Sequence, residues 1–285
     1  MTRHRLAQQR PLHRNKMDAA IVIPVFNQLH YTRQCLDSLN ACGYPDSMIV
    51  VVNNASTDGT KEFLDGRPAL HVIHNDTNRA CAAAWNQGYR LLGREWTMFL
   101  NNDVLVTEGW LESLIDFAKR ENLGMACPAM CENELNYNLS EYASEFVAKM
   151  KRVKRIGGAH GVAFVVRRNV IETVGGFDEN FRKGGNEDED FFMRVRMGGF
   201  KYAVTGSSFI HHFGSITQKH LQASGLNWRD ETVDYFRQKW RLNWARRKWR
   251  RFCRKATEAW WCRIELLRFG QTLWQVRIKG CIEYR

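Results

Sequence analysis

Four consecutive carboxylates, Glu187-Asp188-Glu189-Asp190, have the composition of an acid–base site. A carboxylate can remove the proton of an attacking hydroxyl, and like-charged neighbours raise its pKa toward the range in which a base is useful. The same acids would also interact favourably with the positive end of a helix dipole. That role does not need four adjacent carboxylates, which repel one another. We therefore interpret the cluster as a site that opens a helix reaching about Met197.

Two further groups could bind a cation or an anion. Asn101-Asn102-Asp103 follows a short apolar run, and His211-His212 follows another. Mg²⁺ and Mn²⁺ prefer oxygen ligands, which Asp103 can supply. Asp103 could equally be a turn residue that closes a strand. A histidine pair taken alone is more often structural, and strand alternation lets only one of the two rings face a given site.

The elements that must position these groups alternate in the first half of the chain. Apolar runs predict strands, and a helical spacing of apolar residues separates them. Alternation of this kind indicates a doubly wound parallel sheet, whose ligands bind beyond the carboxyl ends of the strands. Those ends are polar here, at Asn27, Asn53-Asn54 and Asn101-Asn102-Asp103. The predicted strands are 19–25, 48–52, 70–74 and 96–100, and the predicted helices begin near 31 and span about 80–92.

The second half of the chain lacks the regular alternation of predicted strands and helices. Residues 128–158 are polar and show no clear periodicity. A strand is predicted over 161–167, a helix begins at Asn169, and Gly175-Gly176 interrupts it. The acidic cluster then opens the helix described above, which Gly198-Gly199 ends.

Composition limits the class of protein. The chain has 285 residues, of which 44% are hydrophobic and 25% charged, which fits one large α/β domain or two small ones. No apolar run approaches the roughly 18–20 residues that span a bilayer, and no apolar segment follows the basic N-terminus as in a signal peptide. Eight cysteines without a C-x-x-C pair favour a reduced, cytoplasmic protein.

The net charge of +12 is concentrated at the two ends. Residues 1–16 hold five Lys and Arg and no acid, and residues 237–285 hold fifteen Lys and Arg against three acids. Six of the ten tryptophans also lie in 237–285. Such charge could form a solvated, solubilising face, but solubility does not require tryptophans. We therefore favour contact with an anionic surface, either membrane headgroups or nucleic acid.

Six motifs in order give a more specific indication. The motifs are Ile23-Pro24-Val25-Phe26-Asn27, Val51-Val52-Asn53-Asn54-Ala55-Ser56-Thr57-Asp58-Gly59-Thr60, Leu100-Asn101-Asn102-Asp103, Val174-Gly175-Gly176-Phe177-Asp178-Glu179, Glu187 to Arg194, and His211 to Thr217. With them the chain resembles family 2 inverting glycosyltransferases with the GT-A fold, of the rhamnosyltransferase-like kind, from about Ala19 to Trp240.

The resemblance implies an α/β fold with a Rossmann-like, mostly parallel central sheet, flanking helices and a basic helical C-terminal extension. It divides the chain into a basic disordered arm (1–16), a GT-A domain (17–236) and a basic, Trp-rich helical tail (237–285). Within the domain, 17–127 would bind the nucleotide, and 128–236 would hold the acceptor and the catalytic groups.

The resemblance also implies roles for individual residues. Asp188 would be the general base, with Glu187 and Asp190 orienting it or contacting the acceptor, and Asp103 and His212 would bind Mn²⁺ or Mg²⁺. The positions expected at the donor sugar or acceptor are Gly176, Phe177, Asp178 and Arg194. The positions expected at the nucleotide are Pro24, Phe26, Asn27, Asn53, Asn54, Arg79, Asn86, Asn101 and Asn102.

The implied activity is transfer of a sugar from a nucleotide-diphospho-sugar to an acceptor hydroxyl. A UDP-sugar is the expected donor, although Asn53-Asn54 replaces the usual acidic residues, so dTDP- and GDP-sugars are also compatible. The expected acceptor is a glycan or a lipid-linked glycan. The alternatives are a DNA glycosyltransferase acting on a hydroxymethylated or otherwise modified base, and a catalytically inactive relative that binds nucleic acid.

The sequence allows three interpretations of the tail. Trp249, Phe252, Cys253, Ala256, Trp260, Ile264 and Leu267 recur at helical spacing among basic residues. This stripe could pack back on the domain, lie on an anionic membrane, or bind nucleic acid. The expected location is correspondingly cytoplasmic, peripheral at a membrane or associated with nucleic acid.

Overall fold

The computed structural model describes residues 17–182, 184–214, 216 and 229–285. The predicted arm 1–16 lies outside the described residues. The strands are β1 (Ala19–Val25), β2 (Ile49–Asn54), β3 (His71–Asn75), β4 (Trp96–Leu100), β5 (Val104–Val106), β6 (Met125–Asn133), β7 (Lys154–Ile156), β8 (Ala163–Arg167), β9 (Tyr202–His212), β10 (Trp274–Ile278) and β11 (Cys281–Tyr284).

Helices connect most of these strands. They are α1 (Leu29–Ala41), α2 (Thr60–Asp65), α3 (Ala80–Leu92), α4 (Trp110–Arg120), α5 (Leu139–Met150), α6 (Arg168–Val174), α7 (Glu187–Met197), α9 (Arg229–Lys239) and α10 (Trp244–Phe269), with a 3₁₀ turn, η1, at Asp46–Met48.

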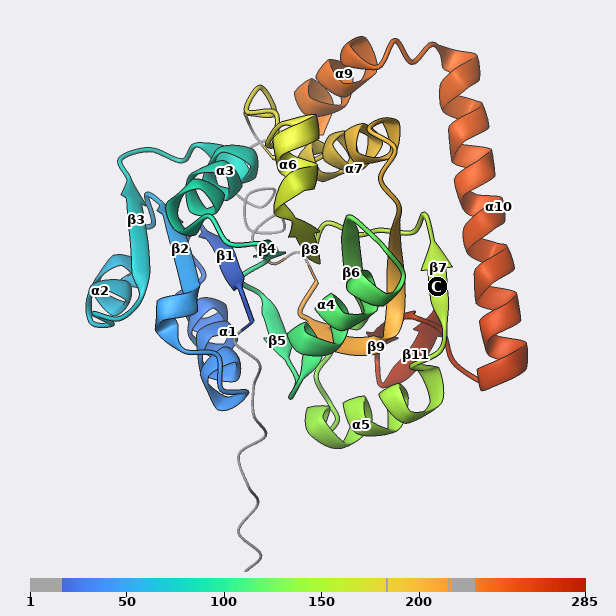
Figure 1. Cartoon of the computed structure of the whole chain (residues 1–285), viewed down its shortest axis with the longest axis horizontal. Helices are drawn as coiled ribbons and strands as arrows, with labels where there is room; N and C mark the ends of the chain where they lie inside the picture. The colour runs from blue at the N-terminus through green and yellow to red at the C-terminus, as the bar shows by residue number, and fades with distance from the viewer. Residues whose placement is uncertain (1–16, 183, 215, 217–228) are drawn as a thin grey trace, which may run out of the picture.

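The first half forms the parallel sheet that the alternation predicts. β3, β2, β1 and β4 lie side by side and are parallel throughout. Both faces of this sheet are buried, because Ile21 and Ile23 of β1 pack with α1 and α4 whereas Val22 packs with α3. A continuous apolar run is what a strand covered on two faces requires. Figure 1 shows the resulting layers of helix, sheet and helix.

The second half adds antiparallel pairs. β8 lies between β4 and β6 and is antiparallel to both. The long strand β9 runs parallel to β6 and antiparallel to β5 and β7. Its pairing with β5 sets Val104 opposite His212, which brings the end of β9 next to the loop that follows β4. The fold is therefore a mixed α/β fold in which the parallel strands of the first half and the antiparallel pairs of the second half share one sheet.

Residues 128–158, in which the sequence shows no clear pattern, contain regular elements. They form most of β6, then α5 and β7. Helix α5 buries Ala143, Phe146 and Met150 at helical spacing against β9. The signal of α5 is short and is flanked by polar residues, which explains why periodicity alone does not find it.

The C-terminal segment is helical only in part. The prediction of a helical tail holds for α10, which ends where Gly270 adopts a left-handed conformation with φ of 69°. It is wrong for 274–284, which form the hairpin β10–β11. β10 pairs in parallel with β6 and covers an edge of the sheet that would otherwise leave backbone groups unpaired. Figure 1 shows α10 running along one side of the molecule from α9 to this hairpin.

A buried ion pair fixes the tail to the domain. Nε of Arg155, which lies on β7, donates to Oε1 of Glu265 on α10 at 2.7 Å, and both side chains are buried. The second oxygen of Glu265 accepts from the backbone N–H of Leu273 at 2.8 Å. The C-terminal part of the tail therefore belongs to the folded domain.

Candidate active site

The loops after β1 and β2 are joined by side-chain hydrogen bonds. The backbone N–H of Asn27 donates to Oγ of Ser56 at 2.7 Å, and Oδ1 of Asn27 accepts from the N–H of Thr57 at 2.7 Å. Pro24 and Phe26, which precede this contact, are half-buried. Pro24, Phe26 and Asn27, three positions expected at the nucleotide, therefore lie at the carboxyl end of β1, next to the loop that follows β2.

The buried asparagines of this region bond within the protein. Oδ1 of Asn53 accepts from the N–H of Ser56 at 3.0 Å, and the amide nitrogen of Asn54 donates to the carbonyl of Ala80 at 3.2 Å. Asn102 donates to Oγ1 of Thr32 at 2.9 Å. These amides shape the loops around the expected nucleotide site.

Asn86 and Arg79 lie on the α3 side. Asn86 is buried and exchanges two hydrogen bonds with the backbone of Phe177, each 2.8 Å long. The guanidinium of Arg79 is about half exposed and lies 3.7 Å from Glu179. Arg79 is thus the basic group at the start of α3 that can reach solvent, whereas Asn86 holds the loop after α6 in place.

Phe177 has contacts within the protein. Its ring packs among Trp85, Phe99 and Phe191 in the core. Its backbone N–H and C=O are both bonded to Asn86, so these contacts are structural, and its expected role at the donor or acceptor stays a prediction. Gly176 precedes it, and a Cβ there would lie 2.4 Å from Oδ1 of Asn86. A glycine is therefore required for the close approach.

Asp103 and His212 face each other at the centre of the sheet. Both are buried, and Nε2 of His212 lies 3.3 Å from Oδ1 of Asp103. Nδ1 of His212 is bonded to Oε1 of Glu132 at 2.9 Å. His211 points the other way, toward the hydroxyl of Tyr137 at 2.8 Å. As strand alternation requires, only one ring of the pair faces Asp103.

The charges of this group stabilise one another. Burial alone would raise the pKa of Asp103, but the charge of His212, a hydrogen bond from that ring and another from the N–H of Ile216 together lower it. Burial alone would lower the pKa of His212, but Asp103 and Glu132 raise it to about 9. Without a bound metal the two carboxylates therefore favour the protonated form of His212, and the ring must lose the proton on Nε2 to bind a metal.

This arrangement fits a divalent cation bound jointly by protein and substrate. Glu132 accepts from Nδ1 of His212 and so directs Nε2 toward Asp103, as the outer carboxylates of metal-binding histidines do. Within the described ranges no group of three or more His, Cys, Asp or Glu side chains is arranged to hold a metal. The protein would thus supply two ligands, Asp103 and His212, and diphosphate oxygens and water the others.

The first turn of α7 contains the second group of carboxylates. Asp188 is half-buried and lies against Gly161, where a Cβ would be 2.0 Å from its Oδ2. Burial raises the pKa of Asp188, and the charge of Glu189 adds to the effect. Glu187 is buried, and its Oε2 has no hydrogen-bond partner among the described residues. Burial and the charge of Asp188 raise the pKa of Glu187 to about 8.

Asp190 has a structural position. It is fully buried, and one oxygen accepts from Nε of Arg194 at 2.9 Å, the ion pair that the spacing predicts. The other oxygen accepts from Nε1 of Trp240 at 3.0 Å and lies 2.7 Å from Nζ of Lys239. Its oxygens bind α7 to α9, which favours the expectation that Asp190 orients the helix of the proposed base over the alternative that it contacts the acceptor.

Asp178 and Arg194 belong to the same network. Asp178 accepts from the hydroxyl of Tyr235 at 2.8 Å and from Nζ of Lys239 at 2.6 Å. Burial raises the pKa of Asp178, but these bonds outweigh it and lower the pKa to about 2. Arg194 donates to the carbonyl of Val174 at 2.9 Å. Both residues thus connect the loop before α7 with α7 and α9.

A short path joins Asp103 and Asp188. The N–H of Asn101, two residues before Asp103, donates to the carbonyl of Val162 at 2.9 Å. Gly161, the preceding residue, is the one that contacts Asp188. The two carboxylates therefore lie near the neighbouring ends of β4 and β8.

No sequence motif marks three residues near the candidate site: Glu132, Gly161 and His160. They lie on β6 and just before β8, in segments without a motif. His160 is buried, with Nε2 bonded to the carbonyl of Pro128 at 2.8 Å, and burial lowers its pKa to about 4. Glu132 raises the pKa of His160 and His212 lowers it, but burial outweighs both charges.

Comparisons with known proteins agree with this arrangement. The sequence model of glycosyl transferase family 2 matches residues 20–175. The chain is 26% identical over 219 residues to glycosyltransferase AglE of Haloferax volcanii, which covers 71% of this chain and 70% of AglE. It is 26% identical over 213 residues to a pre-mycofactocin glycosyltransferase of Mycobacterium tuberculosis, covering 71% of this chain and 43% of that protein.

Solved structures show the same fold. GalNAc-T7 with UDP, GalNAc and Mn²⁺ aligns with a TM-score of 0.57 at 15% identity, covering 70% of this chain and 44% of that one. The mannosyltransferase PcManGT of Pyrobaculum calidifontis, in complex with GDP-Man and Mn²⁺, aligns with a TM-score of 0.52 at 20% identity, covering 68% and 56%. These likenesses identify the fold of this chain as the GT-A fold.

The chain belongs to glycosyl transferase family 2. Its activity is accordingly that of a nucleotide-sugar-dependent glycosyltransferase. Among the described residues, no helix is both long enough and apolar enough to cross a bilayer.

Proposed function

We propose that this protein is an inverting transferase that moves a sugar from a nucleotide-diphospho-sugar to an acceptor hydroxyl, with Asp188 as general base. The observation that carries the proposal is the position of Asp188. Its carboxylate lies at the end of β8, next to the end of β4 where Asp103 is. A base on one side of the reacting carbon and a site for the diphosphate on the other is the geometry of a single in-line displacement.

Each group has a distinct task in this proposal. Asp188, whose pKa burial raises, would remove the proton of the acceptor hydroxyl as that oxygen attacks the anomeric carbon. Asp103 and His212 would hold Mn²⁺ or Mg²⁺, which when bound offsets the charge of the departing nucleoside diphosphate. Arg79 is placed to contact a phosphate from the start of α3. A UDP-sugar is the proposed donor; both structural neighbours described above were solved with nucleotides and Mn²⁺.

Asp188→Asn tests the base. We expect transfer to fall by at least about 100-fold, the usual contribution of a general base, with unchanged binding of UDP and an unchanged melting temperature. Asp190→Asn, two residues further on, is the contrasting variant: it should lower the melting temperature because Arg194 and Lys239 lose a buried partner. Near-normal turnover of Asp188→Asn would refute the assignment.

We further propose a lipid-linked acceptor at an anionic membrane. Helix α10 packs on the domain through Glu265 and Arg250. Four residues of the predicted apolar stripe face outward, since Trp249, Phe252, Trp260 and Leu267 are 61% to 78% exposed, whereas Cys253 and Ile264 are half-buried. Nine Lys and Arg and two Glu share this helix. Exposed indole and aliphatic groups beside cations suit the headgroup region of an anionic bilayer.

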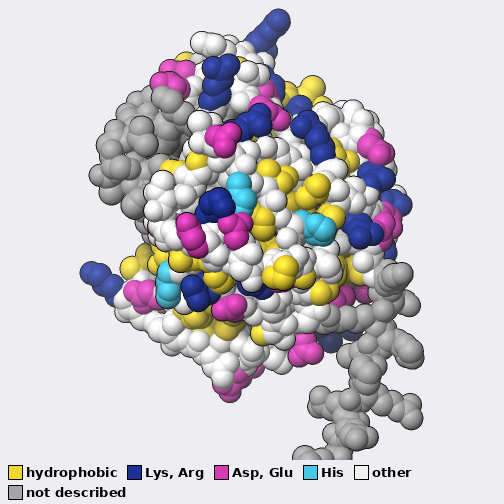
Figure 2. Space-filling model, turned by 90° about the vertical axis from the view of Figure 1, so that its left-hand side faces the viewer, with side chains coloured by type: hydrophobic (Ala, Val, Ile, Leu, Met, Phe, Trp, Pro, Cys, Tyr) yellow, Lys and Arg dark blue, Asp and Glu magenta, His cyan; other side chains and the backbone are white. Residues whose placement is uncertain are grey.

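The charge pattern of the opposite end of the molecule differs. Figure 2 shows that acidic and basic side chains are interspersed over the face that α2 and β3 occupy. A general solubilising role would not require the cations and the exposed tryptophans to share one helix. Their coincidence on α10 favours one contact surface there.

Vesicle sedimentation of the whole chain tests this surface. We expect binding to phosphatidylglycerol-containing vesicles, weaker binding to pure phosphatidylcholine, and a loss of at least tenfold in Trp260→Ser/Leu267→Ser. Leu91→Ser, which alters an exposed apolar residue of α3, is the matched control. Duplex DNA binding with a steep salt dependence, without vesicle binding, would instead support the DNA glycosyltransferase or the inactive nucleic-acid-binding relative.

A further inference from the structure

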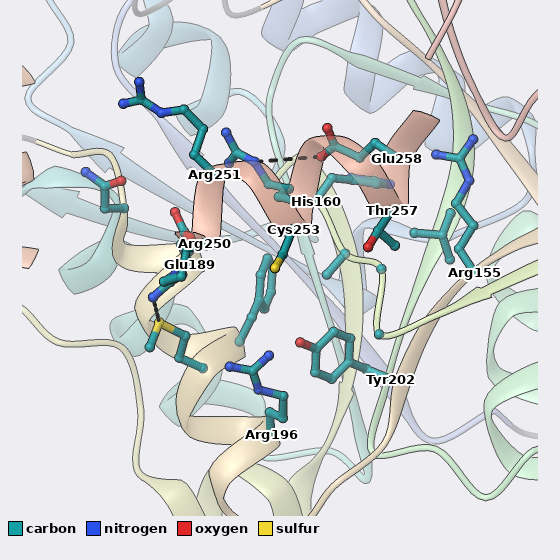
Figure 3. A pocket seen from close by; sticks show the side chains of 18 of the residues that line it. Arg155, His160, Glu189, Arg196, Tyr202, Arg250, Arg251, Cys253, Thr257 and Glu258 are labelled. Atoms are coloured by element: carbon teal, nitrogen blue, oxygen red, sulfur yellow. Dashed lines mark hydrogen bonds and ion pairs between the residues drawn. The ribbon is translucent and has the colours of Figure 1, made fainter. Parts of the chain in front are cut away.

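A pocket separates α10 from the body of the domain. Its volume is about 610 Å³, and its walls come from α10, from α7, from β9 and from the segment between β7 and β8. Figure 3 shows Cys253 and Thr257 pointing from α10 toward Arg196 and Tyr202 on the opposite wall. The ion pair of Arg155 with Glu265 closes the pocket where α10 meets the domain.

Arginines dominate the walls of this pocket. Seven arginines and two glutamates, Glu189 and Glu258, line it. Glu189 is paired with Arg250 at 2.7 Å, and Glu258 lies 3.8 Å from Arg254. The glutamates are therefore already engaged. Pocket arginines that have no carboxylate partner can therefore bind an anionic ligand.

Three of the arginines have no carboxylate partner within the part of the chain that the structure describes. They are Arg196 on α7 and Arg247 and Arg251 on α10. Nε of Arg247 is moreover buried without any hydrogen-bond partner among the described residues. An uncompensated guanidinium in a concave site fits a phosphate, because the planar group of N–H donors matches phosphate oxygens bidentately.

The pocket borders residues that neighbour Asp188 in sequence, although Asp188 itself does not line it. His160 and Asn186 line it, and they directly precede Gly161 and the first turn of α7 that carries Asp188. Aromatic side chains, including Tyr202, Trp261 and Trp274, form other parts of the wall. Aromatic faces with a few charged groups are the usual lining of a site for an organic ligand.

We infer that this pocket binds a phosphate or diphosphate group of the acceptor, so that the acceptor is a phosphorylated saccharide. This inference rests on the proposed function, since it places the acceptor hydroxyl at Asp188 and the anionic group at Arg196, Arg247 and Arg251. The phosphate can belong to a phosphosaccharide free in solution or to a saccharide linked to a lipid through a diphosphate. Both sources present the same anion to the same arginines.

Binding measurements that need no turnover test the pocket. Calorimetry of the whole chain, with UDP present to occupy the donor site, would compare glucose, mannose and galactose 6-phosphates with the unphosphorylated sugars. We expect the phosphates to bind measurably more tightly. Arg196→Gln/Arg251→Gln should weaken that binding by about tenfold or more, the value of one charge-assisted hydrogen bond. Arg263→Gln, an exposed arginine of α10 outside the pocket, should bind as the wild type does.

A second experiment distinguishes a free phosphosaccharide from one that is linked to a lipid. Phosphatidylcholine vesicles with and without a polyprenyl diphosphate would be sedimented with the same three proteins. Binding that requires the diphosphate and is lost in the double variant identifies a lipid-linked acceptor, and binding of the hexose phosphates alone identifies a free one. Either result supports the pocket.

Three outcomes would overturn the inference: equal binding of phosphorylated and neutral sugars, unchanged binding in the double variant, or preferential binding of duplex DNA through the same arginines. A different set of results would contradict the proposed glycosyltransferase function and leave the pocket intact. In that case UDP-sugars would show neither binding nor metal-dependent hydrolysis, while phosphosaccharide binding and its loss in the double variant would persist.

Discussion

Glu132 accepts a hydrogen bond from Nδ1 of His212 at 2.9 Å, on the side of the ring opposite Asp103. The second oxygen of Glu132 accepts from Nε1 of Trp274 at 2.9 Å. Because Trp274 belongs to β10, the C-terminal hairpin helps to hold the histidine in the orientation that presents Nε2 to the expected metal.

Glu132→Gln should therefore weaken metal binding. Loss of the outer carboxylate of a metal-binding histidine usually costs about 10- to 100-fold in affinity, because the ring is less basic and less fixed. Titration of Mn²⁺ into the UDP-bound protein, followed by the paramagnetic signal of free Mn²⁺, measures the effect. Glu121→Gln, which removes an ion pair with Lys154, is the control. Equal Mn²⁺ affinity in the three proteins would contradict the role of Glu132.

Gly161→Ala should reduce turnover without unfolding the protein. The new Cβ would lie 2.0 Å from Oδ2 and 2.7 Å from Cγ of Asp188, so the carboxylate must move away from its position. A displacement of about 1 Å can cost about 100-fold in rate, and we expect a loss of that size in kcat. Steady-state kinetics and UDP binding would be measured together. Gly66→Ala, where a Cβ meets atoms no nearer than 3.5 Å, should behave as the wild type.

Glu187→Gln should stabilise the protein at high pH. Burial and Asp188 raise the pKa of Glu187 to about 8, from an ordinary 4.5, so the folded chain holds this proton more tightly than the unfolded chain. The free energy of unfolding of the wild type therefore falls as the pH rises from about 4.5 to about 8. Glutamine stays neutral and avoids this loss.

Thermal melts across that pH interval measure the effect of Glu187→Gln. The variant and the wild type should melt together near pH 4.5, and the variant should melt at the higher temperature near pH 8. A constant difference at all pH values would show that the effect does not come from this ionisation.

Arg155→Met should destabilise the whole domain. It leaves Glu265 buried and without its cationic partner, which costs about 3–5 kcal/mol in free energy of unfolding. Urea denaturation followed by circular dichroism measures that loss. Arg155→Met/Glu265→Leu should recover most of it, because apolar residues of similar volume often replace a buried pair without loss. A tail that were merely appended to the domain would leave the denaturation curve of Arg155→Met unchanged.

The sequence determines the parallel half of the fold and the order of the polar loops. β1 and β4 agree with their predicted limits, since a strand buried on both faces must be continuously apolar. The i, i+4 spacing of Asp190 and Arg194 predicts their ion pair, and alternation along β9 predicts that a single histidine faces Asp103. Such features depend on neighbours within one element, which a local pattern records.

Tertiary structure alone decides which side chains share a site. Glu132 and Gly161 act through residues distant in sequence, and nothing in their own segments marks them. Asp190 is a carboxylate of the same cluster as Asp188, but Lys239 at the end of α9 and the adjacent Trp240 occupy its oxygens. The hairpin of 274–284 forms because β6 offers an unpaired edge, and the outward stripe of α10 follows from the burial of Glu265. Each of these outcomes depends on which partner the fold brings within contact distance.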